Sequence, residues 1–149
     1  MANTVEVIGD SWTVLILRDA FLGVRRFDEF VEDLGIARNV LTDRLERLVS
    51  AGLLETRPYK DNPPRNEYRL TEKGKDLFDV LMVLWSFGER WNPPPDPRHQ
   101  RVIHRKCGNE ALAVTHCSHC GERLTRHDVS IEPPLPVVAA RAATAAALP

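Results

Sequence analysis

The sequence has no marked excess of charge of either sign. Its 20 Lys and Arg residues nearly balance 21 Asp and Glu residues, which leaves a formal net charge of −1. A basic field over the whole protein is therefore excluded, although a local basic face is not. The chain also has no apolar run of membrane-spanning length, since the longest, Val80–Trp85, follows Asp79 and precedes Ser86. No signal-peptide pattern precedes the first predicted helix, so we expect a cytoplasmic protein with no membrane partner.

Cysteine is scarce and confined to one place. The three cysteines all lie between residues 107 and 120. A set of this kind argues against the disulfide framework of a small secreted protein, and it favours metal or redox chemistry inside a cell. A length of 149 residues suits one domain with a small appendage.

Proline marks the division between these two parts. The segment Asn92–Pro97 holds four prolines and predicts a stiff linker. We expect a first domain over residues 1–92, a proline-rich linker over 93–100 and a small module over 101–132. Residues 133–149 are rich in proline and then in alanine, and we expect them to be disordered.

The first domain is organised around the segment Leu41–Thr71. It begins as a helix with leucines at helical spacing and breaks at Ala51-Gly52, where glycine suits the left-handed backbone that ends many helices. Two extended runs follow, Leu53–Tyr59 and Asn66–Leu70, and the prolines between them cannot continue a central strand. A helix followed directly by a polar hairpin is the outline of a winged helix.

Two helices are predicted before this one. The first is Asn3–Gly23, in which Asp10-Ser11 offers an N-cap, so the piece Val5–Ile8 is either a separate short helix or an extended arm. The second follows Arg26, and its apolar residues fall at i, i+3, i+4 and i+7. A short turn at Gly35-Ile36 leads to the next helix, residues 37–51. This is helix-turn-helix spacing, in which the second helix enters the major groove of DNA.

The recognition helix, residues 37–51, has a polar side suited to DNA. Bidentate geometry fits Arg38 to guanine and Asn39 to adenine, and Thr42 can contact phosphate or a thymine methyl group. Asp43 can only accept a hydrogen bond, for example from cytosine N4. The other predicted DNA-binding residues are basic, on this helix or beside it: Arg26, Arg44, Arg47, Lys60 and Arg65. The alternative is that these are solvated surface residues of an ordinary helix.

The helix that follows the hairpin, Thr71–Trp91, is apolar on almost every side. Such a helix has to be buried on two sides, and one small domain covers only one of them. We therefore expect a homodimer formed by this helix and the first one; the alternative is a single thick core. The predicted dimer-interface residues are Trp12, Phe78, Leu81, Met82, Leu84 and Trp85.

The second module repeats one pattern, in which two ligands three residues apart precede a glycine. Such a turn can chelate one metal ion, and the glycine lets backbone N–H groups face the thiolate. We expect a zinc-ribbon-like β module with a closed, structural zinc site, ligated by His104, Cys107, Cys117 and Cys120. His116 and His119 are rival ligands, and three reduced or disulfide-linked cysteines are the alternative to metal.

The chain resembles the HxlR-type branch of winged helix-turn-helix regulators. The resemblance covers residues 5–92 and rests on IGDSWTVLILRD (8–19), RRFDEF (25–30), LTDRLERLVSAGLL (41–54), PPRNEYRLTEKG (63–74) and WSFGERW (85–91). It implies a homodimeric bacterial transcription regulator on pseudo-palindromic operators, and some relatives carry similar HxxCG and CxxCG tails. Three departures stand out. The redox cysteine often found before the first helix would precede Met1, Ala37 replaces a capping serine, and Asp43 replaces an amide.

Together these patterns predict a mainly α protein with a small β-hairpin wing and a zinc-ribbon-like module. We expect a DNA-binding, dimeric transcription regulator and not an enzyme, reading DNA with helix 37–51 and the wing 54–70. Its signal would be a small apolar or aromatic effector, or oxidation of the zinc thiolates. The alternatives are a zinc-stabilised protein-interaction module that does not bind DNA, and a thiol-based redox protein.

Overall fold

The computed structural model describes residues 1–61, 64–93, 95 and 100–130. The chain forms two compact units, Met1–Ala113 and Val114–Pro149. The described elements all lie in the first unit: α1 (Ala2–Ile8), α2 (Ser11–Leu22), α3 (Phe27–Leu34), α4 (Arg38–Ser50), β1 (Leu54–Asp61), β2 (Pro64–Leu70), α5 (Glu72–Lys75) and α6 (Phe78–Trp91). The predicted linker, 93–100, lies largely outside the described residues, and the predicted tail, 133–149, lies wholly outside them. Among the described residues, no helix is long and apolar enough to cross a membrane.

The predicted helix Asn3–Gly23 is two helices in the structure, α1 and α2. They part at Asp10, whose extended backbone (φ −99°, ψ 151°) and side chain cap α2 by accepting a hydrogen bond from the Thr13 N–H at 3.1 Å. An N-cap residue has a non-helical backbone, so α1 cannot run on into α2. Gly23, at φ 100°, ends α2 as predicted.

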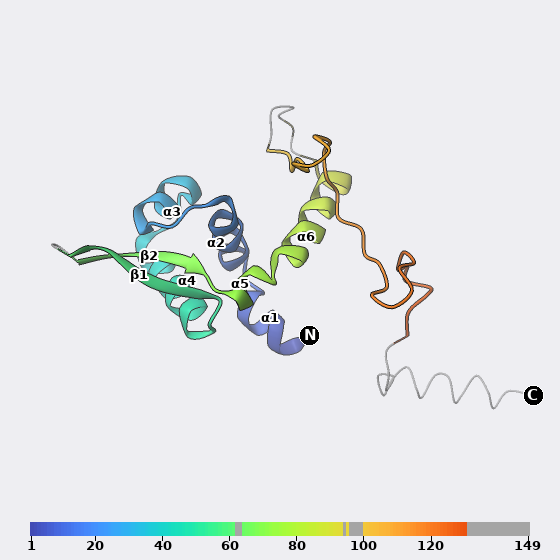
Figure 1. Ribbon diagram of the computed structural model, residues 1–149. Helices are drawn as coiled ribbons and strands as arrows, with labels where there is room; N and C mark the ends of the chain where they lie inside the picture. The colour runs from blue at the N-terminus through green and yellow to red at the C-terminus, as the bar shows by residue number, and fades with distance from the viewer. Residues whose placement is uncertain (62–63, 94, 96–99, 131–149) are drawn as a thin grey trace, which may run out of the picture. The chain divides into compact units, whose positions relative to one another are not determined.

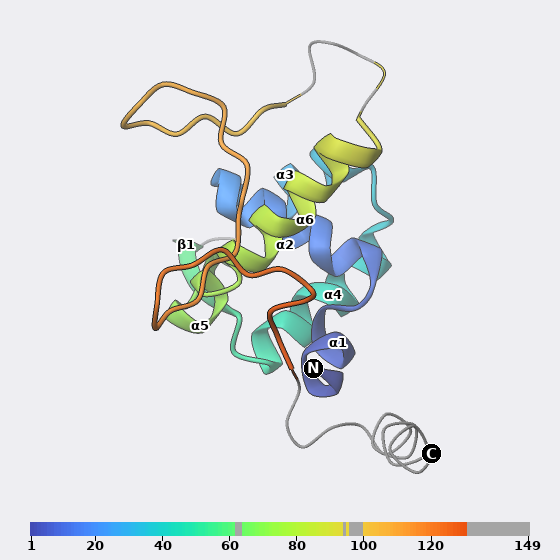
Figure 2. The ribbon, with the colours of Figure 1, turned by 90° about the vertical axis from the view of Figure 1, so that its right-hand side faces the viewer.

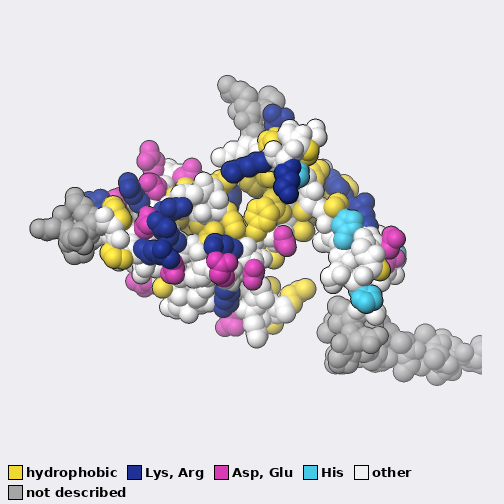
Figure 3. Space-filling model, in the orientation of Figure 1, with side chains coloured by type: hydrophobic (Ala, Val, Ile, Leu, Met, Phe, Trp, Pro, Cys, Tyr) yellow, Lys and Arg dark blue, Asp and Glu magenta, His cyan; other side chains and the backbone are white. Residues whose placement is uncertain are grey.

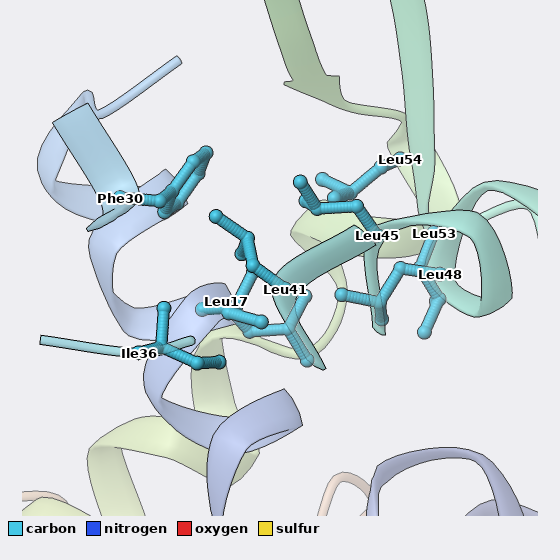
Figure 4. Close-up of a cluster of buried hydrophobic side chains, with 9 residues drawn as sticks. Leu17, Phe30, Ile36, Leu41, Leu45, Leu48, Leu53 and Leu54 are labelled. Atoms are coloured by element: carbon cyan, nitrogen blue, oxygen red, sulfur yellow. The ribbon is translucent and has the colours of Figure 1, made fainter. Parts of the chain in front are cut away.

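Helices α2, α3 and α4 enclose the core together with the start of β1. Figure 4 shows Phe30 of α3 and Ile36 of the turn beside Leu41, Leu45 and Leu48 of α4. All five side chains are buried, and the three leucines recur at i, i+4 and i+7, which places them on one side of α4. This packing leaves the opposite side of α4 free to face solvent.

The hairpin of β1 and β2 is antiparallel and projects from the helices (Figure 1). Both strands are longer than predicted: β1 runs through Pro58 with an irregular register at the next residue, and β2 begins at Pro64. Proline is tolerated at the first position of a strand and at such irregularities. The Tyr68 N–H donates to the Arg25 carbonyl at 2.7 Å, which joins β2 to the segment before α3.

The predicted helix Thr71–Trp91 is also two helices, α5 and α6. Thr71 caps α5 as predicted, and its side chain accepts a hydrogen bond from the Gly74 N–H at 3.0 Å. A tight turn then ends α5, in which the Leu77 N–H donates to the Gly74 carbonyl at 3.1 Å. Helix α6 continues beside α2 (Figures 1 and 2), where the Phe21 and Phe78 rings lie 5.6 Å apart.

Candidate nucleic-acid interface

The exposed side of α4 carries the predicted base-reading residues. Arg38, Asn39 and Thr42 are all exposed and lie in the first two turns of the helix. The Thr42 hydroxyl donates to the Arg38 carbonyl at 3.0 Å. Ala37 is the N-cap residue and provides no side-chain cap, so the first N–H groups of α4 are not satisfied by it. These N–H groups point toward anions that approach the helix end.

Asp43 and Arg44 are half-buried and paired with each other, unlike their exposed neighbours on α4. The Arg44 side chain is only 22% exposed, and its Nε donates to Asp10 Oδ1 at 3.0 Å, so it faces α2. Asp43 pairs with Arg44 and also with Arg47, whose Nε lies 3.1 Å from Asp43 Oδ2. The exposed cation at this end of α4 is Arg47, with 70% of its side chain exposed.

Asp10 is the meeting point of α2 and α4. Burial raises the pKa of Asp10, but hydrogen bonds from the side chain and backbone of Thr13 and from Arg44 outweigh burial, so the pKa lies below its ordinary value. Asp10 is therefore a carboxylate at neutral pH, and it holds Arg44 against α2.

The hairpin presents basic side chains interleaved with acidic ones, as Figure 3 shows. Arg57 pairs with Glu55 at 2.7 Å and Arg65 with Asp28 at 3.8 Å, and both arginines keep more than half of their side chains exposed. Arg26 places its guanidinium 4.8 Å from the centre of the Tyr59 ring. The side chain of Lys60, a predicted DNA-binding residue, lies outside the described residues.

A cleft of about 560 Å³ lies between α3, the start of α4 and the hairpin. Three of the predicted DNA-binding residues line it, Arg26, Arg38 and Arg65, and the structure thereby brings them together. The cleft also contains Asp28, which was not among the predicted DNA-binding residues. Asp28 Oδ1 accepts a hydrogen bond from Arg38 Nη2 at 2.7 Å. Its partners stand 10 and 37 positions away in the chain, so no local pattern identifies it.

The predicted dimer residues fall into two groups. Trp12 and Leu81 pack partly against the core, and Met82 and Trp85 are half-buried. Phe78 and Leu84 are 49% and 50% exposed. No residue of α6 is buried within its own chain. Further apolar residues of α6 are exposed beside them: Val80, Val83, Phe87 and Trp91.

The predicted metal ligands lie in two short knuckles, one in each compact unit. In the first, His104 Nδ1 lies 3.2 Å from Cys107 Sγ, and the Gly108 N–H donates to the His104 carbonyl at 2.8 Å. In the second, the Gly121 N–H donates to the Cys117 carbonyl at 2.9 Å. Each knuckle ends on a left-handed glycine, Gly108 at φ 72° and Gly121 at φ 76°.

The knuckles repeat one backbone pattern 13 positions apart. The His104 N–H donates to the Asn109 carbonyl, just as the Cys117 N–H donates to the Glu122 carbonyl. A single β-bridge closes each loop, Ile103 with Glu110 and His116 with Arg123. The described residues contain no strand of the predicted zinc-ribbon-like β module, and their two bridges form within each loop.

Backbone N–H groups turn toward the sulfurs in both knuckles. The backbone and side-chain N–H groups of Asn109 lower the pKa of the Cys107 thiol. The backbone N–H groups of Cys120 and then His119, followed by the Cys120 thiol, lower the pKa of the Cys117 thiol. Both effects favour the thiolate, which is the form that binds metals. No group of three or more potential metal-binding side chains converges in the part of the chain that the structure describes.

Comparison with known proteins bears on both parts of the chain. Residues 7–96 match the family of HxlR-like helix-turn-helix proteins. The chain is 44% identical over 133 residues to an uncharacterised HTH-type transcriptional regulator of Mycobacterium tuberculosis, covering 89% of this chain and 84% of the relative. A stretch of that length within 149 residues includes both knuckles.

Solved structures agree with this family. The crystal structure of PA1607, a proposed transcription factor, superposes with a TM-score of 0.77 at 37% identity, over 87% of this chain and 90% of that one. A second proposed transcription factor, PA1374 from Pseudomonas aeruginosa, gives a TM-score of 0.63 at 34% identity, over 94% and 97%. The winged fold fits these relatives. The chain belongs to the HxlR-like helix-turn-helix family and is a transcriptional regulator rather than an enzyme.

Proposed function

We propose that this regulator binds double-stranded DNA as a homodimer on a pseudo-palindromic operator. The observation that carries the proposal is the exposed polar start of α4, with Arg38 and Asn39 beside a basic hairpin. A recognition helix reads base edges with its first turns, and two such helices fit half-sites about one helical turn apart. Operator-bound protein works where the DNA is, so the proposal places the chain in the cytoplasm.

The proposed contacts divide by role. Arg38 and Asn39 read base edges, Thr42 contacts phosphate or a thymine methyl group, and Arg47 contacts the DNA backbone. Arg26, Lys60 and Arg65 reach the phosphates or the minor groove beside α4. Arg44 acts indirectly, since it faces Asp10 and positions Asp43. Asp43 accepts a hydrogen bond from a base or contributes to the sequence selectivity of α4.

The proposed dimer rests on α6. Helix α6 has 14 residues, none of them buried, and its Phe78, Leu84 and Phe87 form an apolar surface that stays exposed among the described residues. A second copy of α6, packed together with α2, covers this surface and fixes the separation of the two α4 helices. A small apolar or aromatic effector bound at this interface would change that separation and so the affinity for the operator.

We also propose one structural zinc ion per chain, held by His104, Cys107, Cys117 and Cys120. The support is the repeated knuckle, which aligns His104 with Cys117 and Cys107 with Cys120. The same register aligns the rival residues with non-ligands, His116 with Ile103 and His119 with Lys106. Four ligands close a tetrahedral site, so the ion stabilises structure and does not activate water. Oxidation of its thiolates would release the ion and is a second route for a signal.

The experiment that tests DNA binding starts by selecting bound fragments from random duplex DNA with the purified full chain. The double variant Arg38→Ala/Arg65→Ala should bind the selected duplex at least about tenfold more weakly, because contacts of this kind contribute about 1–3 kcal/mol each. The plot of log affinity against log salt should also become shallower by about one to two.

The control is Arg101→Ala, which removes one positive charge from a side chain that is 58% exposed and lies outside α4 and the hairpin. It should bind the duplex like the unchanged protein. Failure to select any sequence, with an affinity that does not respond to salt, would falsify DNA binding and favour a protein-interaction module.

A further inference from the structure

The cleft beside α4 contains a carboxylate placed between two cations that the proposed function assigns to DNA. Asp28 Oδ1 lies 2.7 Å from Arg38 Nη2, and Asp28 Oδ2 lies 3.8 Å from Arg65 Nη1. The first cation belongs to the recognition helix and the second to the hairpin. One carboxylate therefore bridges the two elements that would grip a DNA strand.

Phe27, the residue before Asp28, also contacts Arg38. The Arg38 guanidinium lies 5.0 Å from the centre of the Phe27 ring, so consecutive residues of α3 hold it from two sides. The start of α3 is itself fixed, since Glu29 Oε2 accepts from the N–H groups of Arg25 and Arg26 at 3.2 and 3.0 Å. The Arg38 guanidinium thus has a defined position in the free protein, at the wall of the cleft.

We propose that Asp28 occupies, in the free protein, the place that a backbone phosphate of DNA takes in the complex. This inference rests on the proposed function. A carboxylate and a phosphate bind guanidinium groups through the same kind of charge-assisted hydrogen bonds. Asp28 therefore competes with DNA for Arg38 and Arg65, and any duplex has to displace it.

The exposure of the groups makes this exchange feasible. Asp28, Arg38 and Arg65 keep 61%, 66% and 52% of their side chains exposed. Ion pairs at such positions are weak because water screens them, so an approaching phosphate can replace the carboxylate. The competition acts on every sequence alike and lowers non-specific binding. Selectivity then depends on the base contacts: on an operator Arg38 leaves Asp28 for a base edge, whereas on other DNA it leaves Asp28 for a phosphate.

The test compares Asp28→Asn with the unchanged protein on a mixed-sequence 24-base-pair duplex, which presents phosphates without an operator. Asp28→Asn should bind about three- to tenfold more tightly at low salt, and its log–log salt dependence should steepen by about one, because a cation freed from Asp28 meets a phosphate. Thermal unfolding of both proteins checks that the fold is retained.

Glu32→Gln is the matched control. Glu32 lines the same cleft, and Glu32→Gln removes one negative charge, as Asp28→Asn does. Among the described residues, however, its contacts include no ion pair with Arg38 or Arg65. Its effect on affinity should be clearly smaller than that of Asp28→Asn.

Combined variants separate the effect of the two Asp28 ion pairs from the effect of net charge. In an Arg38→Ala/Arg65→Ala background, the gain from Asp28→Asn should shrink to that of Glu32→Gln. Equal gains from the two variants in the unchanged background would overturn the proposal, as would weaker binding by Asp28→Asn, which would make Asp28 a support for Arg38 in the complex. If no variant binds any duplex, the proposed function itself fails.

Discussion

At the scale of single residues, Asp10 does three things with one carboxylate. It accepts from the Thr13 N–H at the start of α2, bonds the Thr13 hydroxyl, and receives Arg44 Nε from α4 at 3.0 Å. The cap and the link between helices therefore depend on the same ionised group. Loss of the side chain should loosen both.

We predict that Asp10→Ala lowers the free energy of unfolding by about 1–2 kcal/mol at pH 7, the range for loss of an N-cap residue. The pKa of Asp10 is lowered in the folded state, so its stabilisation is present above the unfolded pKa and is lost as pH falls through the folded one. Urea unfolding at pH 7 and at pH 3 measures the gap between the two proteins. The gap should narrow in acid, and a gap independent of pH would show that the charge of Asp10 contributes nothing.

The same residues show what a sequence can and cannot predict at this scale. The capping role of Asp10 was predicted, because N-caps depend on residues three positions apart. Its bond to Arg44 was not, since the two are 34 positions apart and only packing brings α4 against α2. Asp28 is the same case: its position in a helical first turn is predictable, but its two arginine partners are not.

At the scale of elements, the turn between α5 and α6 determines how α6 leaves the winged domain. Gly74 allows the turn because it lies against the start of β1: a Cβ at this position would stand 2.1 Å from the Leu53 carbonyl oxygen. The Thr71 hydroxyl donates to the Gly52 carbonyl at 2.7 Å and holds the same junction. The junction therefore has no room for a side chain.

We predict that Gly74→Ala destabilises the protein by about 1–3 kcal/mol, the range for overpacking, because the added atom meets backbone that cannot rotate away. Lys75→Ala is the control, since Lys75 is exposed and pairs only locally with Glu72. Its unfolding midpoint should stay close to that of the unchanged protein. Similar midpoints for both variants would mean that the junction yields without strain.

The break at Asp76-Leu77 was not predicted, and one long helix was expected here. The residues from Thr71 to Trp91 have helical periodicity throughout, and local propensity does not reveal a contact with Leu53. Where the pattern alone decides, as in α3 with Phe27, Phe30 and Leu34, the helix was predicted to within a residue. Interruptions that come from tertiary contacts escape such a pattern.

At the scale of the whole molecule, the proposed zinc ion takes two ligands from each knuckle. We predict one zinc per chain by elemental analysis of the purified protein, and a tetrahedral cobalt spectrum with thiolate charge-transfer bands after exchange. Cys107→Ser and Cys117→Ser should each lose the ion, because the ligands act as a set.

The rival histidines give the control for this prediction. His116→Ala and His119→Ala should keep the zinc, since the repeated backbone aligns them with Ile103 and Lys106. His116 Nδ1 already lies 3.0 Å from the Gly121 carbonyl within its own loop. Loss of zinc from His116→Ala but not from His104→Ala would reverse the assignment.

The proposed dimer would also determine how two copies of α4 are held. Sedimentation of the unchanged protein should give a dimer, and Leu84→Glu with Phe87→Glu should give a monomer, because charges on a buried apolar surface oppose association. The two side chains are 50% and 60% exposed in the single chain, so helical content should be retained. Val129→Glu, at a valine that is 53% exposed outside α6, should remain a dimer.

The monomer then separates affinity for one half-site from affinity for two. Each α4 keeps its own exposed face, so the monomeric variant should bind a single half-site about as well as the unchanged protein does. On a two-site duplex the unchanged protein gains from the second contact, which is already tethered, and the monomer loses this gain. If the unchanged protein sediments as a monomer and still distinguishes two-site from one-site DNA, then α6 is not what joins the two recognition helices.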